Sequence, residues 1–219
     1  MRISIVIPLL NEAESLTQLY QEIVQHTQGH DLEIIFIDDG STDVSFEILK
    51  SVAELDKRVR VIRFRRNFGK AAALQIGFSK AQGDIVFTMD ADLQDNPSEI
   101  PKFLEKLEQG YDLVSGWKRK RHDPLHKTLP SRLFNFVTAR TFKLKLRDYN
   151  CGFKAYRHPL EKELNLYGEM HRYIPALANA MGYRVGEIAV EHRARQFGSS
   201  KYGIERYLRG FFDLLTVKM

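Results

Sequence analysis

An apolar run in this chain ends in a group of acidic residues. The segment VFTMDADLQDNP (86–97) carries Asp90, Asp92 and Asp95, with Gln94 between the last two. Carboxylates this close repel one another, so we expect a positive charge among them. Oxygen ligands suit Mg²⁺ or Mn²⁺, and Mg²⁺ usually binds one or two carboxylates together with substrate phosphates. The pattern therefore predicts a binding site for a metal ion that in turn binds a diphosphate. In an extended chain, Asp90, Asp92 and Gln94 would lie on one side.

The segments that must position this group alternate between two patterns. Short runs rich in Ile and Val predict strands at 3–7, 32–37, 59–64, 84–89 and 111–116. Apolar residues at helical spacing predict helices at 14–26, 43–55, 70–81 and 97–108, with Ser41 and Asp43 offering N-cap oxygens to the second. This alternation is typical of an α/β fold, in which helices cover both faces of a parallel sheet.

A polar segment follows each of the first four strands. These segments are PLLNE (8–12), DDGS (38–41), RRNFGK (65–70) and DADLQD (90–95), and a parallel sheet brings all four to one edge. Each alone also fits an ordinary turn, but four on one edge favour a binding site. The chain has neither G-x-G-x-x-G after the first strand nor a P-loop, which leaves a metal as the device for holding phosphates.

The charge of the chain is unevenly distributed. The net charge is +5, but residues 118–147 hold ten Lys or Arg and one acid, so the remainder is net negative. This basic block suggests a surface for an anion, and a solvated basic loop is the alternative. Cys151 is the only cysteine, which excludes an internal disulfide and favours a reducing compartment. No window of 18 apolar residues occurs, so no membrane-spanning segment is expected.

Seven ordered motifs carry a resemblance to a known family. They are VIPLLNE, IDDGSTD, RNFGKAAAL, GDIVFTMDADLQDNP, NCGFKAYR, GEMHRYIPALA and HRARQFGSSKYG. In them the chain resembles the family 2 inverting glycosyltransferases of GT-A fold. Among these it looks like the polyprenyl-phosphate sugar transferases, of the dolichyl-phosphate mannose synthase and undecaprenyl-phosphate glucosyltransferase type. The resemblance covers almost the whole chain and implies a Rossmann-like, mostly parallel sheet with helices on both faces.

The resemblance also implies a domain plan and a division of labour. A catalytic domain over 1–203 would comprise a nucleotide-sugar half (1–117) and an acceptor half (118–203), followed by an amphipathic helix at 204–219. The residues expected to hold the nucleotide base and ribose are Pro8, Leu10, Asn11, Glu12 and Asp38 or Asp39. Lys70 would lie near the nucleotide. Asp90, Asp92 and Gln94 would bind Mg²⁺ or Mn²⁺ and the diphosphate of a UDP- or GDP-sugar.

The acceptor is indicated by a departure from the family pattern. Polysaccharide-building relatives usually carry Q-x-x-R-W, whereas this chain has R-x-x-G-x-S-K from Arg195 to Lys201, which favours a lipid phosphate over a sugar hydroxyl. A polyprenyl phosphate is already anionic and needs no general base, but cations must offset its repulsion by the donor diphosphate. The candidates for this task are Arg119, Arg132, Arg195 and Lys201, with Ser131 as a hydroxyl donor.

Asp148 is the acid expected nearest the reacting carbon. It could orient the sugar, hold an Arg, or act as a base if the acceptor were a hydroxyl; a simple turn aspartate is the alternative. Glu169, His171 and Arg172 are expected either in the donor or acceptor pocket or, for Glu169, as charge at a helix start.

The expected reaction is transfer of the sugar to a polyprenyl phosphate at the cytoplasmic face of the cell membrane. The alternative is the same fold acting on a glycan hydroxyl in cell-envelope polysaccharide synthesis. Amphipathic segments at 204–219 and 131–142 predict binding to the membrane surface, and relatives commonly continue into transmembrane helices that would anchor the chain. No nucleic-acid partner is expected, because 118–132 offers no aromatic side chains for base stacking. The sequence leaves open the sugar, the nucleotide and whether the chain forms a homo-oligomer.

Overall fold

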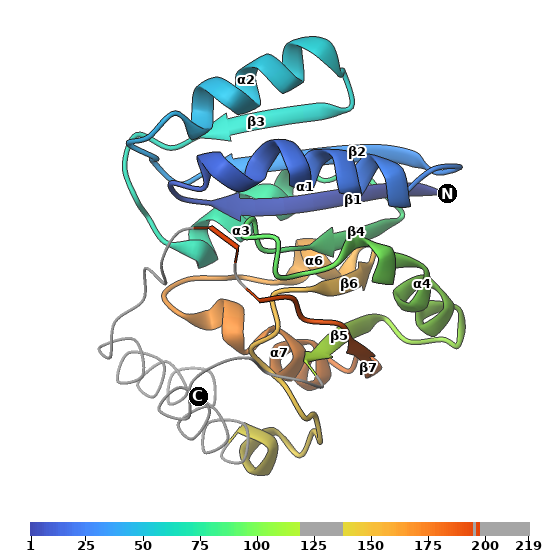
Figure 1. Cartoon of the computed structure of the whole chain (residues 1–219). Helices are drawn as coiled ribbons and strands as arrows, with labels where there is room; N and C mark the ends of the chain where they lie inside the picture. The colour runs from blue at the N-terminus through green and yellow to red at the C-terminus, as the bar shows by residue number, and fades with distance from the viewer. Residues whose placement is uncertain (119–137, 195, 198–219) are drawn as a thin grey trace.

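The computed structural model describes residues 1–118, 138–194 and 196–197 (Figure 1). Within these residues, seven strands form one sheet in the order β3-β2-β1-β4-β6-β5-β7. The strands are β1 (Arg2–Leu9), β2 (Asp31–Asp38), β3 (Val59–Arg63), β4 (Ile85–Thr88), β5 (Leu113–Lys118), β6 (Lys154–Arg157) and β7 (Val185–Val190). β6 runs antiparallel to β4 and β5, and the other neighbouring pairs are parallel. The predicted mostly parallel α/β sheet is confirmed.

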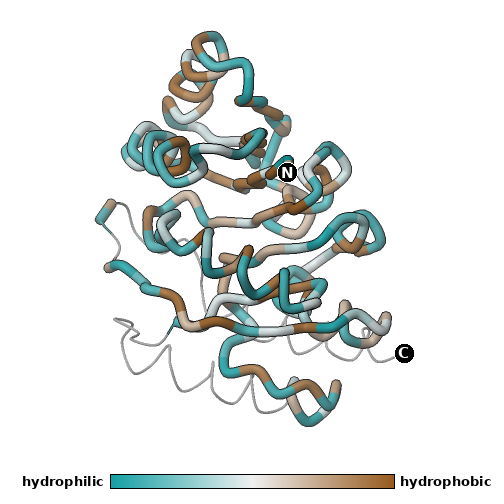
Figure 2. Tube along the Cα trace, turned by 90° about the vertical axis from the view of Figure 1, so that its right-hand side faces the viewer, coloured by the Kyte–Doolittle hydropathy of each residue, from teal (hydrophilic) through white to brown (hydrophobic). Residues whose placement is uncertain are grey.

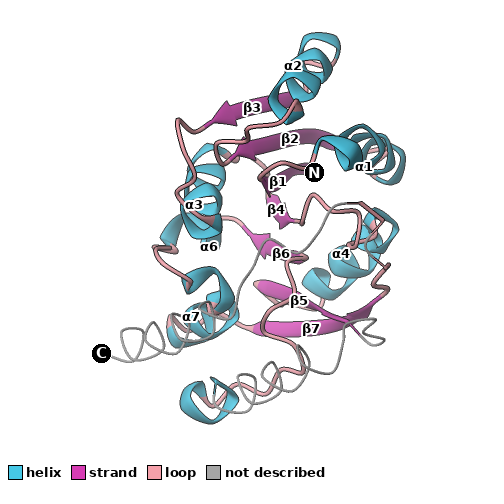
Figure 3. Ribbon diagram, turned by 60° about the vertical axis from the view of Figure 1, so that its left-hand side comes forward, coloured by secondary structure: helices cyan, strands magenta, loops and turns pink. Residues whose placement is uncertain are grey.

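Helices cover both faces of this sheet. The helical elements described are α1 (Ala13–His26), α2 (Ser45–Leu55), α3 (Lys70–Lys80), η1 (Pro97–Glu99), α4 (Ile100–Glu108), α6 (Leu160–Glu163), η2 (Met170–Arg172) and α7 (Ile174–Ala180), of which η1 and η2 are 3₁₀ turns. Figure 3 shows α1, α2 and α4 on one face and α3, α6 and α7 on the other. The predicted helices of the first half all occur, with their ends shifted by a residue or two.

β1 is an almost continuous apolar run because its side chains are buried on both faces of the sheet. Ile5 packs in the cluster that contains Leu19 of α1, and Val6 packs on the other face with Phe78 of α3. All four side chains are fully buried, and each such burial stabilises the fold by about 1.5–3 kcal/mol. α3 approaches so closely that a Cβ added at Gly77 would lie 2.2 Å from Val6 Cγ1. This packing on both faces fixes the position of β1 and of the polar segment that follows it.

The helices have the amphipathic pattern of elements that cover a sheet. α4, for example, buries Ile100, Phe103 and Leu107 at helical spacing and exposes its other side. Figure 2 shows hydrophilic and hydrophobic residues mixed along the described helices. In the described ranges, no helix is both long and apolar enough to cross a lipid bilayer.

Candidate active site

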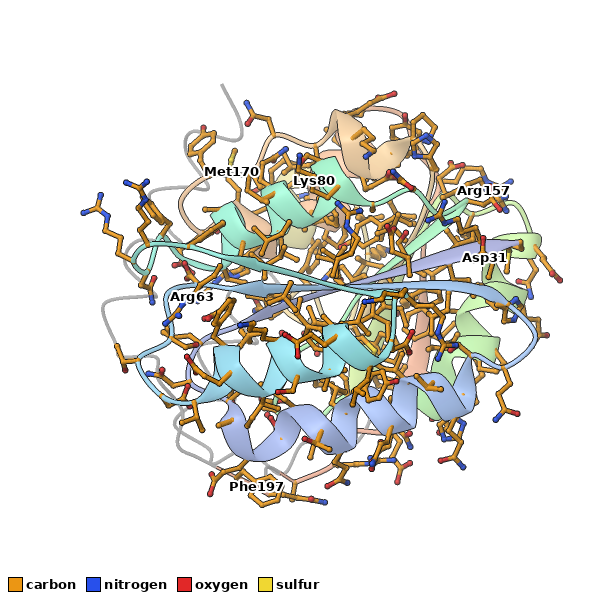
Figure 4. The ribbon with its side chains drawn as sticks, turned by 90° about the horizontal axis from the view of Figure 1, so that it is seen from above. Asp31, Arg63, Lys80, Arg157, Met170 and Phe197 are labelled. Atoms are coloured by element: carbon orange, nitrogen blue, oxygen red, sulfur yellow. The ribbon has the colours of Figure 1, made fainter. Side chains whose placement is uncertain are left out.

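The polar segments after β1, β2, β3 and β4 meet at one edge of the sheet, as the parallel order predicts. In Figure 4, Arg63 at the end of β3 lies at this edge, and Asp31 at the start of β2 lies at the opposite one. The sequence prediction that these four segments form one rim is confirmed. The rim is therefore the candidate active site.

The first two polar segments are bound to each other by side chains from both. Asn11 N donates to Ser41 Oγ (2.8 Å), and Thr42 N donates to Asn11 Oδ1 (2.7 Å). Glu12 N donates to Ser45 Oγ (3.0 Å). Asn11 has a φ of 52°, a left-handed conformation that Asn tolerates better than most residues. Asn11 and Glu12 therefore help to shape the rim, while their predicted contacts with a nucleotide, like those of Pro8 and Leu10, stay predictions.

The expected N-cap of α2 is wrong in detail. The helix begins at Ser45 with Val44 at the N-cap position and no side-chain cap. Asp43 Oδ1 instead accepts from Ser45 N (3.0 Å), and Ser41 Oγ is engaged with the first polar segment. The two oxygens expected at the helix end thus hold the loop between β2 and α2.

Asp38 and Asp39 organise neighbouring loops. Asp38 is fully buried, and its Oδ1 accepts from Ser41 N (2.8 Å). Asp39 accepts from Phe68 N (2.7 Å) through Oδ1 and from Gly69 N (2.9 Å) through Oδ2. Burial raises the pKa of Asp39, against the opposing effect of these two amides. Asp39 therefore fixes the residues that immediately precede α3; the expected ribose contact remains untested.

Lys70, the first residue of α3, contacts the Asp90 carboxylate through its Nζ. Burial would raise the pKa of Asp90, but the ammonium groups of Lys70 and Lys118 outweigh it and lower the pKa well below its usual range. Gly152 borders the same carboxylate, since a Cβ at this position would lie 2.6 Å from Asp90 Oδ2. The NCGF motif and the acidic turn are thus packed together, although Gly152 and Asp90 are 62 residues apart in the sequence.

The acidic segment itself is not extended, contrary to the sequence prediction. Asp92 Oδ1 accepts from Gln94 N (3.1 Å), Asp95 Oδ2 accepts from Asp90 N (3.1 Å), and Leu93 has a φ of 62°. These bonds fold residues 90–95 into a turn. Burial, and the nearby negative charges of Asp90 and Asp92, raise the pKa of Asp95 to about 6.

A later segment completes this turn. Arg193 N donates to Gln94 O (3.0 Å), and Asp95 forms an isolated bridge with His192. Gln94 Nε2 lies 3.3 Å from His192 Nε2. The HRARQF motif is therefore brought against the acidic turn, and it adds His192, a residue to which sequence reasoning gave no role.

Two lysines, the half-buried Lys118 and the buried Lys154, lie among the acids of the site and were not singled out from the sequence. Lys118 ends β5; burial opposes its charge, but Asp95 and Asp90 outweigh burial and raise the pKa of Lys118. Lys154 begins β6, is 3% exposed and donates through Nζ to Cys151 O. Burial lowers the pKa of Lys154. Lys118 was counted only as part of the basic block, and Lys154 only as a letter of the NCGFKAYR motif.

Asp148, the acid expected nearest the reacting carbon, is buried, and its expected place beside that carbon stays a prediction. Its side chain is buried, with 1% of the residue exposed, and Oδ1 accepts from Asn150 N (3.0 Å). Its charge acts on both Lys118 and Lys154. This environment suits a residue that positions cations. The Arg147 guanidinium lies over the nearby Trp117 ring, with its Cζ 4.2 Å from the ring centroid.

Several predicted site residues lie outside the part of the chain that the structure describes. They are Arg119, Ser131, Arg132, Arg195 and Lys201. The predicted amphipathic helix at 204–219 and most of the second amphipathic segment at 131–142 also lie there. Their roles stay predictions.

The residues of the acidic turn fit a divalent cation that binds together with a diphosphate. In the described ranges, no three His, Cys, Asp or Glu side chains form a ready-made cluster for a metal ion. Asp92 and Asp90 nevertheless offer carboxylate oxygens, and Gln94 offers an amide next to His192. Because Mg²⁺ keeps waters and substrate phosphates among its ligands, one or two carboxylates suffice.

This sheet, with one antiparallel strand beside β4 and an acidic turn at its edge, defines a glycosyltransferase of the GT-A class. The chain belongs to glycosyl transferase family 2, whose model matches residues 4–164. The family resemblance drawn from the motifs is therefore confirmed.

Two relatives carry more specific names. A dodecaprenyl-phosphate galacturonate synthase from Rhizobium johnstonii is 40% identical over 224 residues, which cover 99% of this chain and 66% of that protein. An undecaprenyl-phosphate 4-deoxy-4-formamido-L-arabinose transferase from Salmonella paratyphi B is 38% identical over 218 residues, which cover 98% of this chain and 67% of that protein. The chain thus spans about two thirds of the length of these relatives.

Solved structures agree on the fold. Glucosyl-3-phosphoglycerate synthase from Mycobacterium tuberculosis, crystallised with Mn²⁺, UDP and phosphoglyceric acid, is 22% identical with a TM-score of 0.77, over 99% of this chain and 78% of that chain. The same protein crystallised with Mg²⁺ and UDP also has a TM-score of 0.77 at 22% identity, over 99% of this chain and 79% of that chain. At this identity the likeness shows the fold, and it confirms the GT-A prediction.

Proposed function

We propose that this chain transfers a sugar from a UDP- or GDP-sugar to a polyprenyl phosphate, with inversion and with Mg²⁺ or Mn²⁺ as cofactor. The observation that carries the proposal is the arrangement at the sheet edge, where Lys70 contacts Asp90 and the charges of Lys118 and Lys154 act on the same carboxylate. The two relatives are named as enzymes acting on undecaprenyl or dodecaprenyl phosphate, which supports the same class of acceptor here. The Mycobacterium protein binds UDP with Mn²⁺ or Mg²⁺ on this fold, which supports the donor class and the metal.

In this mechanism the metal, when bound, neutralises charge that develops on the departing nucleoside diphosphate. Asp92 and Asp90 would hold it, with Gln94 completing the turn. Lys70 is positioned to exchange its contact with Asp90 for a phosphate oxygen, since a flexible ammonium can bind either group. The charge of Lys118 favours the ionised forms of Asp90 and Asp95.

The surroundings of Asp148 favour an acceptor that needs no general base. A base must reach the proton that it removes, whereas Asp148 is buried and engaged with Asn150 N. A phosphate acceptor instead needs cations, and Arg119, Arg132, Arg195 and Lys201 remain the proposed ones, with Ser131 as a donor. Because polyprenyl phosphates reside in membranes, we place the reaction at the cytoplasmic membrane surface, with 204–219 as the proposed contact.

Product analysis tests the proposal. The full chain is incubated with Mn²⁺, a labelled UDP- or GDP-sugar and a short-chain polyprenyl phosphate, and label is followed into an organic extract. We expect a labelled lipid that depends on the polyprenyl phosphate and disappears with a chelator. Label transferred to a glycan acceptor would identify the alternative function, and no transfer with any UDP- or GDP-sugar would overturn the proposal.

A further inference from the structure

Residues 191–193, which follow β7, form a strap against the acidic turn. Arg193 N donates to Gln94 O (3.0 Å), which fixes the backbone of the strap to the turn. Arg193 Nη1 donates to Glu22 Oε2 of α1 (2.7 Å), which fixes the strap on its other side. His192 lies between these anchors and is 7% exposed. The ring of His192 is therefore held at one position next to the turn.

The side-chain amide of Gln94 is bound to this strap by its nitrogen. Gln94 Nε2 lies 3.3 Å from Arg193 O and 3.3 Å from His192 Nε2. A backbone carbonyl can only accept, so the amide atom that faces it must be the nitrogen. His192 Nε2 then accepts as well, and its ring carries the proton on Nδ1. No described residue donates to Gln94 Oε1, so the oxygen is the atom left for a ligand.

The orientation of this amide matters for a metal ion. The last torsion of a glutamine side chain has two similar minima, which exchange the oxygen and the nitrogen. Only the oxygen can bind a divalent cation, and an –NH₂ group in its place would repel the cation. Two acceptors around Gln94 Nε2 favour the orientation that leaves the oxygen for the cation. Gln94 N also donates to Asp92 Oδ1 (3.1 Å), so this oxygen belongs to the same turn as the proposed metal carboxylate.

We propose that His192 is a positioning residue of the metal site, which accepts from Gln94 Nε2 and thereby presents Gln94 Oε1 to the divalent cation. The inference rests on the proposed function, because it concerns the metal that accompanies the donor diphosphate. It gives His192 an indirect role, since the ring nitrogen faces an amide group. Residues that orient a metal ligand in this way typically contribute about 10- to 100-fold to metal affinity.

The test measures how strongly Mn²⁺ and a nucleotide promote each other's binding. The dissociation constant of UDP is determined by calorimetry with Mn²⁺ and with a chelator, and the ratio of the two constants is the metal enhancement. GDP serves as the second nucleotide. We expect His192→Phe to lower the metal enhancement about tenfold and to leave nucleotide binding without metal unchanged. His192→Gln, whose side-chain oxygen can take the place of Nε2, should restore most of the enhancement.

A double-mutant cycle distinguishes this indirect role from direct coordination. Gln94→Ala alone should lower the metal enhancement, and adding His192→Phe should lower it no further, because His192 acts through Gln94. Losses that multiply in the double variant would show that His192 itself contacts the metal or the nucleotide, and would overturn the inference. If His192→Phe does not fold, His192→Met takes its place, because a flexible thioether adapts to a buried space.

Glu191→Ala is the matched control. It removes the hydrogen bond from Asn96 Nδ2 to Glu191 Oε2 (2.9 Å) in the same strap and leaves the amide of Gln94 untouched. The control should keep the metal enhancement, and a loss as large as that of His192→Phe would assign the effect to the strap as a whole and overturn the inference. If Mn²⁺ does not enhance nucleotide binding by the wild-type chain, the metal of the proposed function is wrong and the inference falls with it. An enhancement that is normal in both the wild-type chain and the His192 variants would overturn the inference alone.

Discussion

Gly152 lies directly against the carboxylate of Asp90, so closely that a Cβ on Gly152 would sit 2.6 Å from Asp90 Oδ2 and 2.8 Å from Oδ1. The carbonyl of the same glycine accepts from Thr88 Oγ1 (2.8 Å) at the end of β4. The first acid of the candidate metal site is therefore positioned by a segment that belongs to the other half of the chain. A side chain at position 152 must displace this carboxylate.

Gly152→Ala should therefore reduce sugar transfer at least tenfold while the chain still folds. The carboxylate must move to relieve the contact, and misplacement of a binding group by about 1 Å can cost a hundredfold in rate. Transfer rates and the free energy of unfolding by urea would be measured together. Gly182→Ala is the matched control, because a Cβ there meets no atom within 4 Å and only its φ of 94° is strained. The control should lose stability and keep its transfer rate; if both variants keep full activity, the proposed role of Asp90 is wrong.

Asp92→Asn tests the metal site. The amide keeps the shape of the side chain and an oxygen for Gln94 N, but it removes a negative charge next to a hard cation. We expect Mn²⁺-dependent transfer to fall by about two orders of magnitude or more, with the thermal unfolding midpoint little changed. Asp31→Asn, whose side chain is 72% exposed at the opposite edge, is the control. Near-normal turnover of Asp92→Asn with Mn²⁺ would remove this residue from the metal site.

The first half of the fold was predictable because its signals are local. Strands such as β1 and β2 are buried on both faces, so burial leaves a readable run of Ile and Val. Their parallel order then places the polar ends of the first four strands on one edge, and the acidic segment at 90–95 was found in this way. That reasoning missed the folding of this segment into a turn. The hydrogen bonds that Asp92 and Asp95 accept from backbone amides leave no periodic pattern in the sequence.

The second half gave weaker signals. β6 has only four residues, and its direction depends on pairing with β4 and β5, which lie far away in the sequence. Lys118 and Lys154 were missed because a lysine is withdrawn from solvent, partly or wholly, only when acids from other segments compensate its charge. Those acids, Asp90, Asp95 and Asp148, come together only in the folded chain. His192 likewise acquires its neighbour Gln94 through tertiary structure.

Asp39→Asn tests whether the loop before α3 is held by one carboxylate. Asp39 accepts two backbone N–H groups with its two oxygens, and an amide can accept only one of them. We expect the free energy of unfolding to fall by about 1–2 kcal/mol, with weaker nucleotide binding. Asp84→Asn is a matched control, because Asp84 accepts Arg2 N (2.8 Å) at the far edge of the sheet. If both variants weaken nucleotide binding equally, Asp39 has no special function.

The neutral state of His171 predicts how stability depends on pH. Burial lowers the pKa of this ring in the folded chain, while in the unfolded chain it titrates near its ordinary value of 6.5. Below that pH the unfolded state binds the additional proton, so stability that is present at neutral pH is lost progressively as the pH falls. The loss attributable to one such group approaches about 1.4 kcal/mol per pH unit.

His171→Asn removes this proton linkage, because asparagine does not titrate. Between about pH 7.5 and about pH 5.5, the variant should lose roughly 1 kcal/mol less stability than the wild-type chain. Urea unfolding at a series of pH values, without nucleotide or metal, provides the measurement. His171→Phe, which also lacks a titrating ring, should show the same smaller dependence on pH. An unchanged slope in His171→Asn would mean that the pKa of this ring is the same in the folded and the unfolded chain.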